Sequence, residues 1–100
     1  GYGVEVKADY MSQETGNIVI EIKFNGRWSA LMTTRAKFWA IVTNDEIAMI
    51  TPERIKTCII MEDQRAKDFT ANGDSKEKRA YLIPKNILWN YAMKVIPYGQ

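Results

Sequence analysis

Two acids and one lysine on neighbouring segments form the arrangement in this sequence that is most suited to chemistry. Asp9 ends the stretch VEVKAD, and Glu21 and Lys23 lie two residues apart within IVIEIKF. Two carboxylates held close together repel each other unless a cation lies between them or one of them is protonated. A site of oxygen ligands suits Mg²⁺ or Mn²⁺, which bind one or two carboxylates, waters and a substrate phosphate. The three residues therefore predict metal-assisted hydrolysis of a phosphodiester.

An antiparallel hairpin is the element expected to bring these residues together. Residues 4–10 and 18–24 alternate apolar and polar side chains, and SQETGN between them supplies turn formers. With the turn centred near Thr15, Asp9 falls beside Glu21 and Lys7 falls beside Lys23. The buried face of this hairpin is predicted to hold Val4, Val6, Ala8, Ile18, Ile20, Ile22 and Phe24.

Each member of the polar face has an expected role. Asp9 and Glu21 bind the metal, and the backbone carbonyl of Ile22 points to the same place as a third ligand. Lys23 orients or activates the attacking water and offsets charge on the phosphate. The other interpretation is an ordinary solvated sheet face, because Glu-x-Lys is common on exposed strands.

The rest of the chain predicts one α/β (α+β) domain over residues 1–100, with a mixed β-sheet core flanked by helices. The Thr33–Thr34 pair is expected to cap a short helix that ends near Phe38. Residues 62–79 are predicted to form a mobile polar loop. The remaining expected elements are a strand, turn and strand over 38–51, a helix over 52–61, a strand at 80–83, a short helix from Pro84 and a last strand or tail over 93–98.

The composition excludes several classes of protein. The chain has no His and a single Cys, Cys58, which excludes Ser–His and Cys–His hydrolases, an internal disulfide and a multi-Cys zinc site. Cys58 is expected to be a small buried hydrophobic residue. No apolar run approaches the roughly 18 residues that span a bilayer, so we expect no membrane partner and a cytoplasmic location, in a bacterial or phage-infected cell.

The segments VEVKAD and IEIK resemble the two-strand signature of the PD-(D/E)xK nuclease superfamily, in which an Asp and a Glu-x-Lys bind the metal. SALMTTRAKFW and AYLIP are similar to later segments of the small phage-type, Holliday junction resolvase-like nucleases of that superfamily. The resemblance implies a restriction-endonuclease-like fold, with Asp9 and Glu21 as metal ligands and Lys23 as the catalytic lysine. It implies a Mg²⁺- or Mn²⁺-dependent endodeoxyribonuclease that selects junctions, flaps or nicks over sequence and that works as a homodimer or higher homo-oligomer.

The sequence differs from the superfamily pattern at two places. The superfamily adds a Glu from a helix before the first strand, but only three residues precede Val4, so we expect that helix to be missing and Glu5, with Lys7, to be auxiliary. An acid is expected near position 37, where this chain has Lys37. These differences favour the alternative function, a catalytically impaired nuclease-fold domain that binds DNA. A structural or partner-binding domain is a third alternative.

A cationic window follows Glu21, since no acid occurs between it and Asp45. Phosphates are expected to meet its basic and hydroxyl side chains mostly through the DNA backbone, with weak sequence reading and strong salt dependence. Trp39, Phe38 and Trp89 are expected in the core, whereas Trp28 is equally consistent with core and surface. The DNA-contacting residues are predicted to be Arg27, Thr33, Thr34, Arg35 and Lys37.

Overall fold

Two four-stranded β-sheets and a few short helices make up the protein, an α+β fold. The computed structural model describes residues 3–70 and 77–99. The elements in chain order are β1 (Val4–Ala8), α1 (Ser12–Thr15), β2 (Asn17–Phe24), β3 (Arg27–Trp28), the 3-10 helix η1 (Ala30–Met32), β4 (Phe38–Val42), β5 (Glu46–Ile50), α2 (Pro52–Met61), β6 (Ala66–Thr70), β7 (Glu77–Pro84), α3 (Lys85–Trp89) and β8 (Lys94–Pro97).

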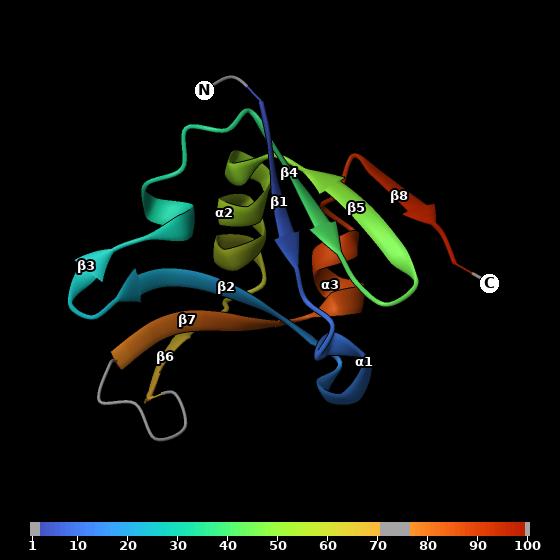
Figure 1. The fold of residues 1–100 in the computed structure, drawn as a ribbon. Coiled ribbons are helices and arrows are strands. Elements are labelled where there is room, and N and C mark those ends of the chain that lie inside the picture. Colours follow the sequence, from blue (N-terminus) through green and yellow to red (C-terminus); the bar gives the residue numbers. More distant parts are fainter. Residues whose placement is uncertain (1–2, 71–76, 100) are drawn as a thin grey trace.

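The two sheets differ in how their strands pair. The first sheet has the order β1-β4-β5-β8 and is mixed, because β1 runs parallel to β4 while the other neighbours are antiparallel. The second sheet has the order β3-β2-β7-β6 and is antiparallel throughout. Figure 1 shows β1 and β2 diverging from their shared end near α1, with α2 behind the first sheet. The predicted mixed sheet is therefore present, beside a second sheet.

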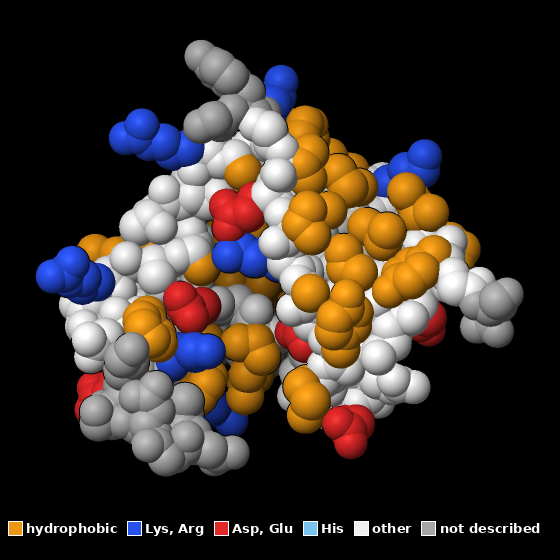
Figure 2. Space-filling view, in the orientation of Figure 1, with side chains coloured by type: hydrophobic (Ala, Val, Ile, Leu, Met, Phe, Trp, Pro, Cys, Tyr) orange, Lys and Arg blue, Asp and Glu red, His pale blue; other side chains and the backbone are white. Residues whose placement is uncertain are grey.

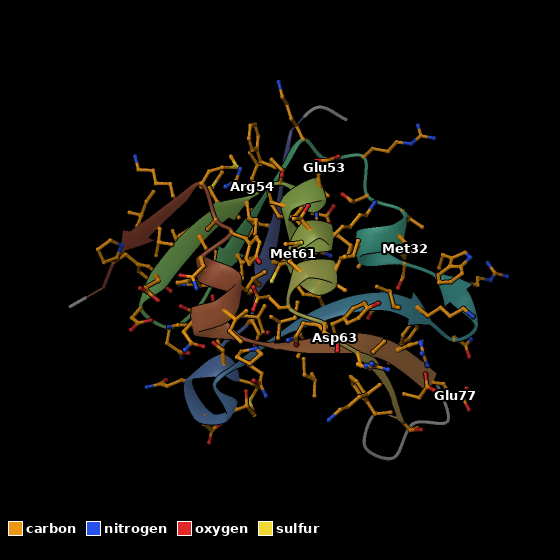
Figure 3. The ribbon with its side chains drawn as sticks, turned by 180° about the vertical axis from the view of Figure 1, so that it is seen from behind. Met32, Glu53, Arg54, Met61, Asp63 and Glu77 are labelled. Carbon is orange, nitrogen blue, oxygen red and sulfur yellow. The ribbon has the colours of Figure 1, made fainter. Side chains whose placement is uncertain are left out.

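Local chemistry explains the elements that the sequence predicted correctly. Helix α2 begins after Thr51, whose side chain accepts the Arg54 amide at 3.2 Å, and Pro52 occupies its first turn. Ile55 and Cys58 face inward from this helix. Viewed from behind, α2 lies against the segment after α3, where Arg54 Nε donates to the Tyr91 carbonyl at 2.6 Å (Figure 3). The β4–β5 hairpin, the helix over 52–61 and the strand near the C-terminus are confirmed.

The core lies between the inner faces of the sheets and the helices. Trp39 and Cys58 are buried in it, as predicted, whereas Phe38 and Trp89 are only partly buried. No helix within the described residues is long and apolar enough to cross a membrane. The buried apolar cluster consists of Ile18, Ile20, Ile22, Leu31, Trp39, Ile41, Ile50, Ile55, Cys58, Ile83 and Leu88.

The expected hairpin between residues 4–10 and 18–24 is wrong. Alternating side chains identified both strands, but alternation does not specify which strand is the partner. The turn between them is the short helix α1, where the Ser12 hydroxyl donates to the Asp9 carbonyl at 2.9 Å and Gly16 takes a left-handed φ of 76°. After this helix the chain enters the second sheet as β2, so Lys7 and Lys23 belong to different sheets.

The buried face of β1 is also opposite to the one predicted. Val4 and Val6 are 50% and 65% exposed, whereas Glu5 and Lys7 are only partly exposed. Period-two alternation distinguishes two faces without saying which one is covered. In β1 the charged side chains face inward because Glu5 finds hydrogen-bonding partners there.

Two further expectations differ from the structure. The Thr pair caps no helix ending near Phe38, because η1 ends at Met32 and residues 33–37 are irregular. The segment 62–79 was expected to be a mobile polar loop, but it contains β6 and the start of β7. Across this strand pair Arg79 Nη1 donates to both carboxylate oxygens of Asp68 at 2.9 Å. Residues 71–76 of that segment lie outside the described residues.

Candidate active site

A cavity between the diverging strands β1 and β2 brings together both predicted metal ligands. It has a volume of about 340 Å³, and Asp9, Glu21, Lys7 and Lys78 line it above an apolar floor that includes Trp39. Figure 2 shows acidic and basic side chains in the hollow between the two sheets. We call this cavity the carboxylate pocket. Asp9 and Glu21 thus reach one site from two different sheets, by a route other than the predicted hairpin.

Asp9 connects the end of β1 to the edge of β2 through hydrogen bonds. Its backbone amide donates to the Val42 carbonyl at 2.8 Å, which extends the parallel pairing with β4. Its Oδ2 accepts the Val19 amide at 2.8 Å and so takes the place of a strand partner. Among residues 3–70 and 77–99, Oδ1 has no hydrogen-bond partner. One carboxylate oxygen of Asp9 therefore stays available to a ligand.

Glu21 is positioned by the hairpin that follows it. Asn25 and Gly26 have φ values of 51° and 81°, which suit the two-residue turn joining β2 and β3. The turn brings Ser29 back, so that its amide donates to the Ile22 carbonyl at 2.9 Å and its hydroxyl donates to Glu21 Oε2 at 2.5 Å. The other oxygen, Oε1, lies 3.7 Å from Lys78 Nζ.

Lys23 and Glu21 line different cavities. The pairing of β2 with β7 shifts register between these two residues, and Lys23 Nζ lies 4.7 Å from the centre of the exposed Trp28 ring. Lys23 lines a neighbouring cavity of about 280 Å³ with Arg79 and Lys78. Lys78 lines both cavities and is the lysine paired with Glu21. The sequence did not predict Lys78 as a site residue, because it lies in the polar run KEKR, which was predicted to be a loop.

Glu5 and Lys7 form a second polar group on the inward face of β1. Lys7 Nζ lies 2.7 Å from Glu5 Oε2 and 5.1 Å from the centre of the Trp39 ring. The Thr34 hydroxyl donates to Glu5 Oε1 at 2.8 Å and accepts the Trp39 indole N–H at 3.1 Å. Burial opposes ionisation of Glu5, but the hydrogen bonds from Lys7 and Thr34 outweigh it and lower the pKa of this carboxyl group.

The predicted DNA-contacting residues fall into two groups. Thr34 is engaged within the protein by Glu5 and Trp39, so it acts as a structural link between β1 and β4. Exposed side chains are found at Arg27, Thr33, Arg35 and Lys37. Lys37 lies over the Phe38 ring at 5.9 Å, and within the described part of the chain none of these three basic residues forms an ion pair.

Asp9 and Glu21 are the acids that line the carboxylate pocket. No group of three or more His, Cys, Asp or Glu that could hold a metal occurs among the described residues. Within the described residues Asp9 Oδ1 has no hydrogen-bond partner and Glu21 Oε1 makes only the 3.7 Å contact to Lys78 Nζ, so each acid offers one oxygen. Ile22, the predicted third ligand, does not line the carboxylate pocket, and its carbonyl accepts the Ser29 amide at 2.9 Å. The protein ligands that the pocket could offer are therefore the two carboxylates, and Mg²⁺ commonly binds one or two carboxylates together with waters and phosphate.

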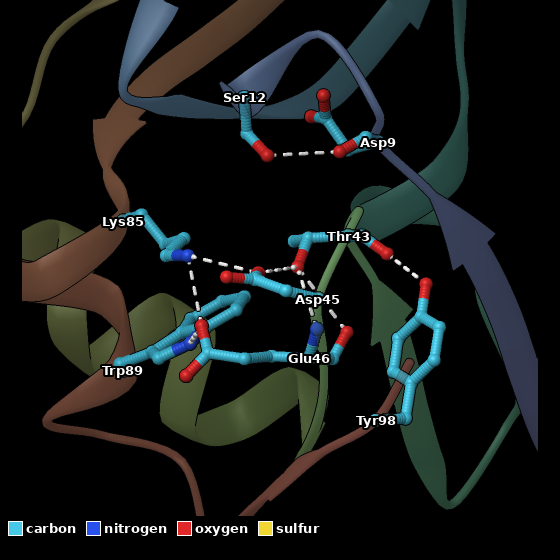
Figure 4. A network of polar contacts seen from close by, with 8 residues as sticks. All are labelled: Asp9, Ser12, Thr43, Asp45, Glu46, Lys85, Trp89 and Tyr98. Carbon is cyan, nitrogen blue, oxygen red and sulfur yellow. Dashed lines mark hydrogen bonds and ion pairs between the residues drawn. The ribbon is translucent and has the colours of Figure 1, made fainter. Parts of the chain in front are cut away.

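A separate polar network joins α3 to the β4–β5 turn (Figure 4). Lys85 Nζ lies 2.8 Å from Glu46 Oε1 and 3.7 Å from Asp45 Oδ1, and the Trp89 indole donates to Glu46 at 3.0 Å. The hydrogen bond to Glu46 is the main cause that raises the pKa of Lys85. The buried Thr43 hydroxyl bonds Asp45 and Glu46. These contacts link α3 to the β4–β5 turn.

Comparison of the chain with protein-family models, with curated proteins and with solved structures finds no match.

Proposed function

We propose that this protein is a divalent-metal-dependent endodeoxyribonuclease with a restriction-endonuclease-like core. One observation carries the proposal, which is that Asp9 and Glu21 line the same pocket together with Lys7 and Lys78. Two acids and two bases around one cavity match what phosphodiester hydrolysis needs, since charge must be balanced on the metal and on the phosphate. We propose DNA as the substrate, and junctions, flaps or nicks as its preferred forms, because the exposed basic side chains of Arg27, Arg35 and Lys37 favour contact with the phosphate backbone.

Asp9 and Glu21 would hold the cation, each through the oxygen that accepts no hydrogen bond from residues 3–70 and 77–99. A bound Mg²⁺ or Mn²⁺ supplies a water of lowered pKa and polarises a phosphoryl oxygen. Ser29 and the Val19 amide fix the two carboxylates in place. Lys78, beside Glu21, offsets charge on the scissile phosphate, which is the role that the sequence assigned to Lys23. Lys23, over the exposed Trp28, then contacts DNA next to the pocket.

Nicking of a supercoiled plasmid with Mg²⁺ or Mn²⁺ tests the proposal. Asp9→Asn and Glu21→Gln keep the shape of each side chain, and Asn can still accept the Val19 amide, so both variants should fold. We expect each to lose about 100-fold or more in rate. Glu53→Gln is the matched control, because Glu53 is exposed on α2 at the back of the molecule (Figure 3). Unchanged nicking by Glu21→Gln would remove the proposed mechanism.

The two lysines give a sharper comparison. Lys78→Met should lower the nicking rate more than Lys23→Met, because Lys78 alone of the two lines the carboxylate pocket. Lys23→Met should chiefly weaken DNA binding. The opposite order of effects on the rate would return the catalytic role to Lys23.

A second candidate function is DNA binding without cleavage. Ser29 and Lys78 together contact both oxygens of Glu21, and Lys37 stands where the superfamily pattern has an acid. Calorimetry with Mn²⁺ separates the two candidates, since only the nuclease requires the cation to bind at Asp9 and Glu21. Absent Mn²⁺ binding combined with salt-sensitive DNA binding would favour this second function.

A further inference from the structure

Trp28 presents an indole ring to solvent at the edge of the second sheet. It lies in the short strand β3, whose partner in the described chain is β2, and it is 58% exposed. The indole N–H groups of the other two tryptophans are bonded within the protein, Trp39 to Thr34 and Trp89 to Glu46. Within the described residues the Trp28 N–H has no acceptor. Tryptophan is enriched at binding interfaces, because its ring combines a large apolar area with this polar group.

A cation lies over one side of this ring. Lys23 is the cross-strand partner of Trp28, and its Nζ lies 4.7 Å from the centre of the ring. Among residues 3–70 and 77–99 Lys23 forms no ion pair. The cation–π attraction holds the indole in place, while the ammonium group keeps its positive charge uncompensated by an acid. A flat ligand that stacks on the exposed part of the ring therefore finds a positive charge beside it.

Further positive charge lines the cavity next to this pair. Lys23, Lys78 and Arg79 line it together with the acids Asp68 and Glu77, and its volume is about 280 Å³. Both carboxylate oxygens of Asp68 accept Arg79 Nη1 at 2.9 Å, so the charge of this acid is already balanced. The bases of the cavity therefore outnumber its acids, and an anionic group fits it better than a cation does.

An exposed aromatic ring beside positive charge suits a single strand of nucleic acid. Bases stack on aromatic side chains, and the phosphates of the same strand meet the cations. In a fully paired duplex each base is covered by the pairs above and below it, so a surface indole reaches the face of a base only where a nucleotide is unpaired or flipped out. A paired duplex would contact the cations but would leave Trp28 without a ligand.

We propose that an unpaired nucleotide of the DNA stacks its base on Trp28 and places its phosphate beside Lys23. Lys78 lines both this cavity and the carboxylate pocket, so the same strand continues to Asp9 and Glu21. A flap supplies such a nucleotide, whereas a nick or a fully paired junction does not. The choice of DNA as the ligand rests on the proposed function, and the stacking narrows the preferred substrate to DNA with a single-stranded segment.

Fluorescence anisotropy in EDTA tests the proposal, because it measures DNA binding without metal-dependent cleavage. One labelled probe is a duplex that carries a single-stranded oligothymidine flap, and the other is the same duplex with a nick and no flap. The wild type should bind the flap about tenfold more tightly than the nick. Trp28→Ala should raise Kd for the flap about tenfold and leave Kd for the nick within about twofold. Met61→Ala is the matched control, because Met61 is 70% exposed on α2 (Figure 3), and it should bind both probes like the wild type.

Trp28→Phe separates stacking from a merely structural role of Trp28 in the β2–β3 hairpin. Phe keeps an aromatic ring, so Kd for the flap should stay within about threefold of the wild-type value. The quenching of tryptophan fluorescence that the flap causes in the wild type should be lost in this variant. Circular dichroism checks that the variants fold.

Two outcomes would overturn the proposal, whatever the nicking assay shows. The first is a wild type that binds the two probes equally well or binds neither. The second is a folded Trp28→Ala variant that keeps the preference for the flap. A flap preference that depends on Trp28, in a protein that nicks no DNA, would support the stacking and refute only the proposed cleavage.

Discussion

Thr34 offers a direct test of whether the inward face of β1 is built as described. Its hydroxyl donates to Glu5, and it accepts the indole N–H of Trp39 at 3.1 Å and the amide of Ala36 at 3.2 Å. Thr34→Val keeps the shape of the side chain and removes all three bonds. Trp39 is only 1% exposed, so water cannot replace the lost acceptor.

The magnitude follows from the groups left without partners. A buried donor without an acceptor costs about 1–3 kcal/mol, and the lost bond to the Glu5 carboxylate adds about 1 kcal/mol. We therefore expect Thr34→Val to lower the free energy of unfolding by about 2–4 kcal/mol. In a domain of this size that corresponds to a fall in Tm of roughly 10–25 °C.

Urea denaturation followed by tryptophan fluorescence is the assay, with thermal melting in parallel. Thr33→Val is the matched control, because Thr33 is exposed and its hydroxyl makes only a 3.5 Å contact with the Ala30 carbonyl, so we expect a change within about 0.5 kcal/mol. Thr34→Ser should retain most of the stability. Equal effects of the two valine substitutions would refute the structural role of Thr34 and restore its predicted role as a phosphate contact.

Three other predictions concern single residues. The lowered pKa of Glu5 means that its ionised form stabilises the folded protein at pH values above the ordinary pKa of 4.5. This stabilisation is lost as the pH falls through the lowered pKa of the folded protein. In urea titrations the stability difference between wild type and Glu5→Gln should therefore shrink from pH 6 to pH 3. Burial, with a smaller effect of Glu62, raises the pKa of Cys58 to about 11, so a thiol reagent at pH 8 should react only as the protein unfolds, and rapid labelling of folded protein would contradict this. Gly26→Ala should cost about 1 kcal/mol in the same denaturation assay because of its left-handed φ of 81°, whereas Gly3→Ala, which meets open space, should be neutral.

Local sequence signals predicted the elements that depend on neighbouring residues. Thr51 and Pro52 marked the start of α2, and the apolar runs on either side of Asn44–Asp45 marked the β4–β5 hairpin. Such features depend on capping and turn chemistry within a few residues, so the sequence contains most of the information needed.

The partner and the buried face of β1 could not be predicted in this way. Val4 and Val6 alternate with Glu5 and Lys7, and the alternation is the same whichever side faces solvent. The choice depends on Thr34, which is distant in sequence and supplies the hydrogen bond that lets Glu5 face inward.

The sequence predicted that Asp9 and Glu21 lie close together, but it did not predict that Lys78 is the lysine beside Glu21. Asp9 and Glu21 do share a pocket, although no hairpin joins their strands, because the Asp9 carboxylate binds the edge of β2. Lys78 reaches Glu21 only because β7 pairs with β2, a long-range contact that the polar run around it conceals.

The parallel pairing of β1 with β4 has a consequence for how the protein assembles. Val4 lies opposite Phe38, so β1 has no strand partner until the whole of β2, β3 and η1 has been made and folded back. Contacts of such high sequence separation form slowly, because the intervening chain must first lose its freedom. The pocket wall supplied by β1 is therefore completed late in folding, and amide hydrogens on this strand should gain protection from exchange after those of the locally paired β4–β5 hairpin.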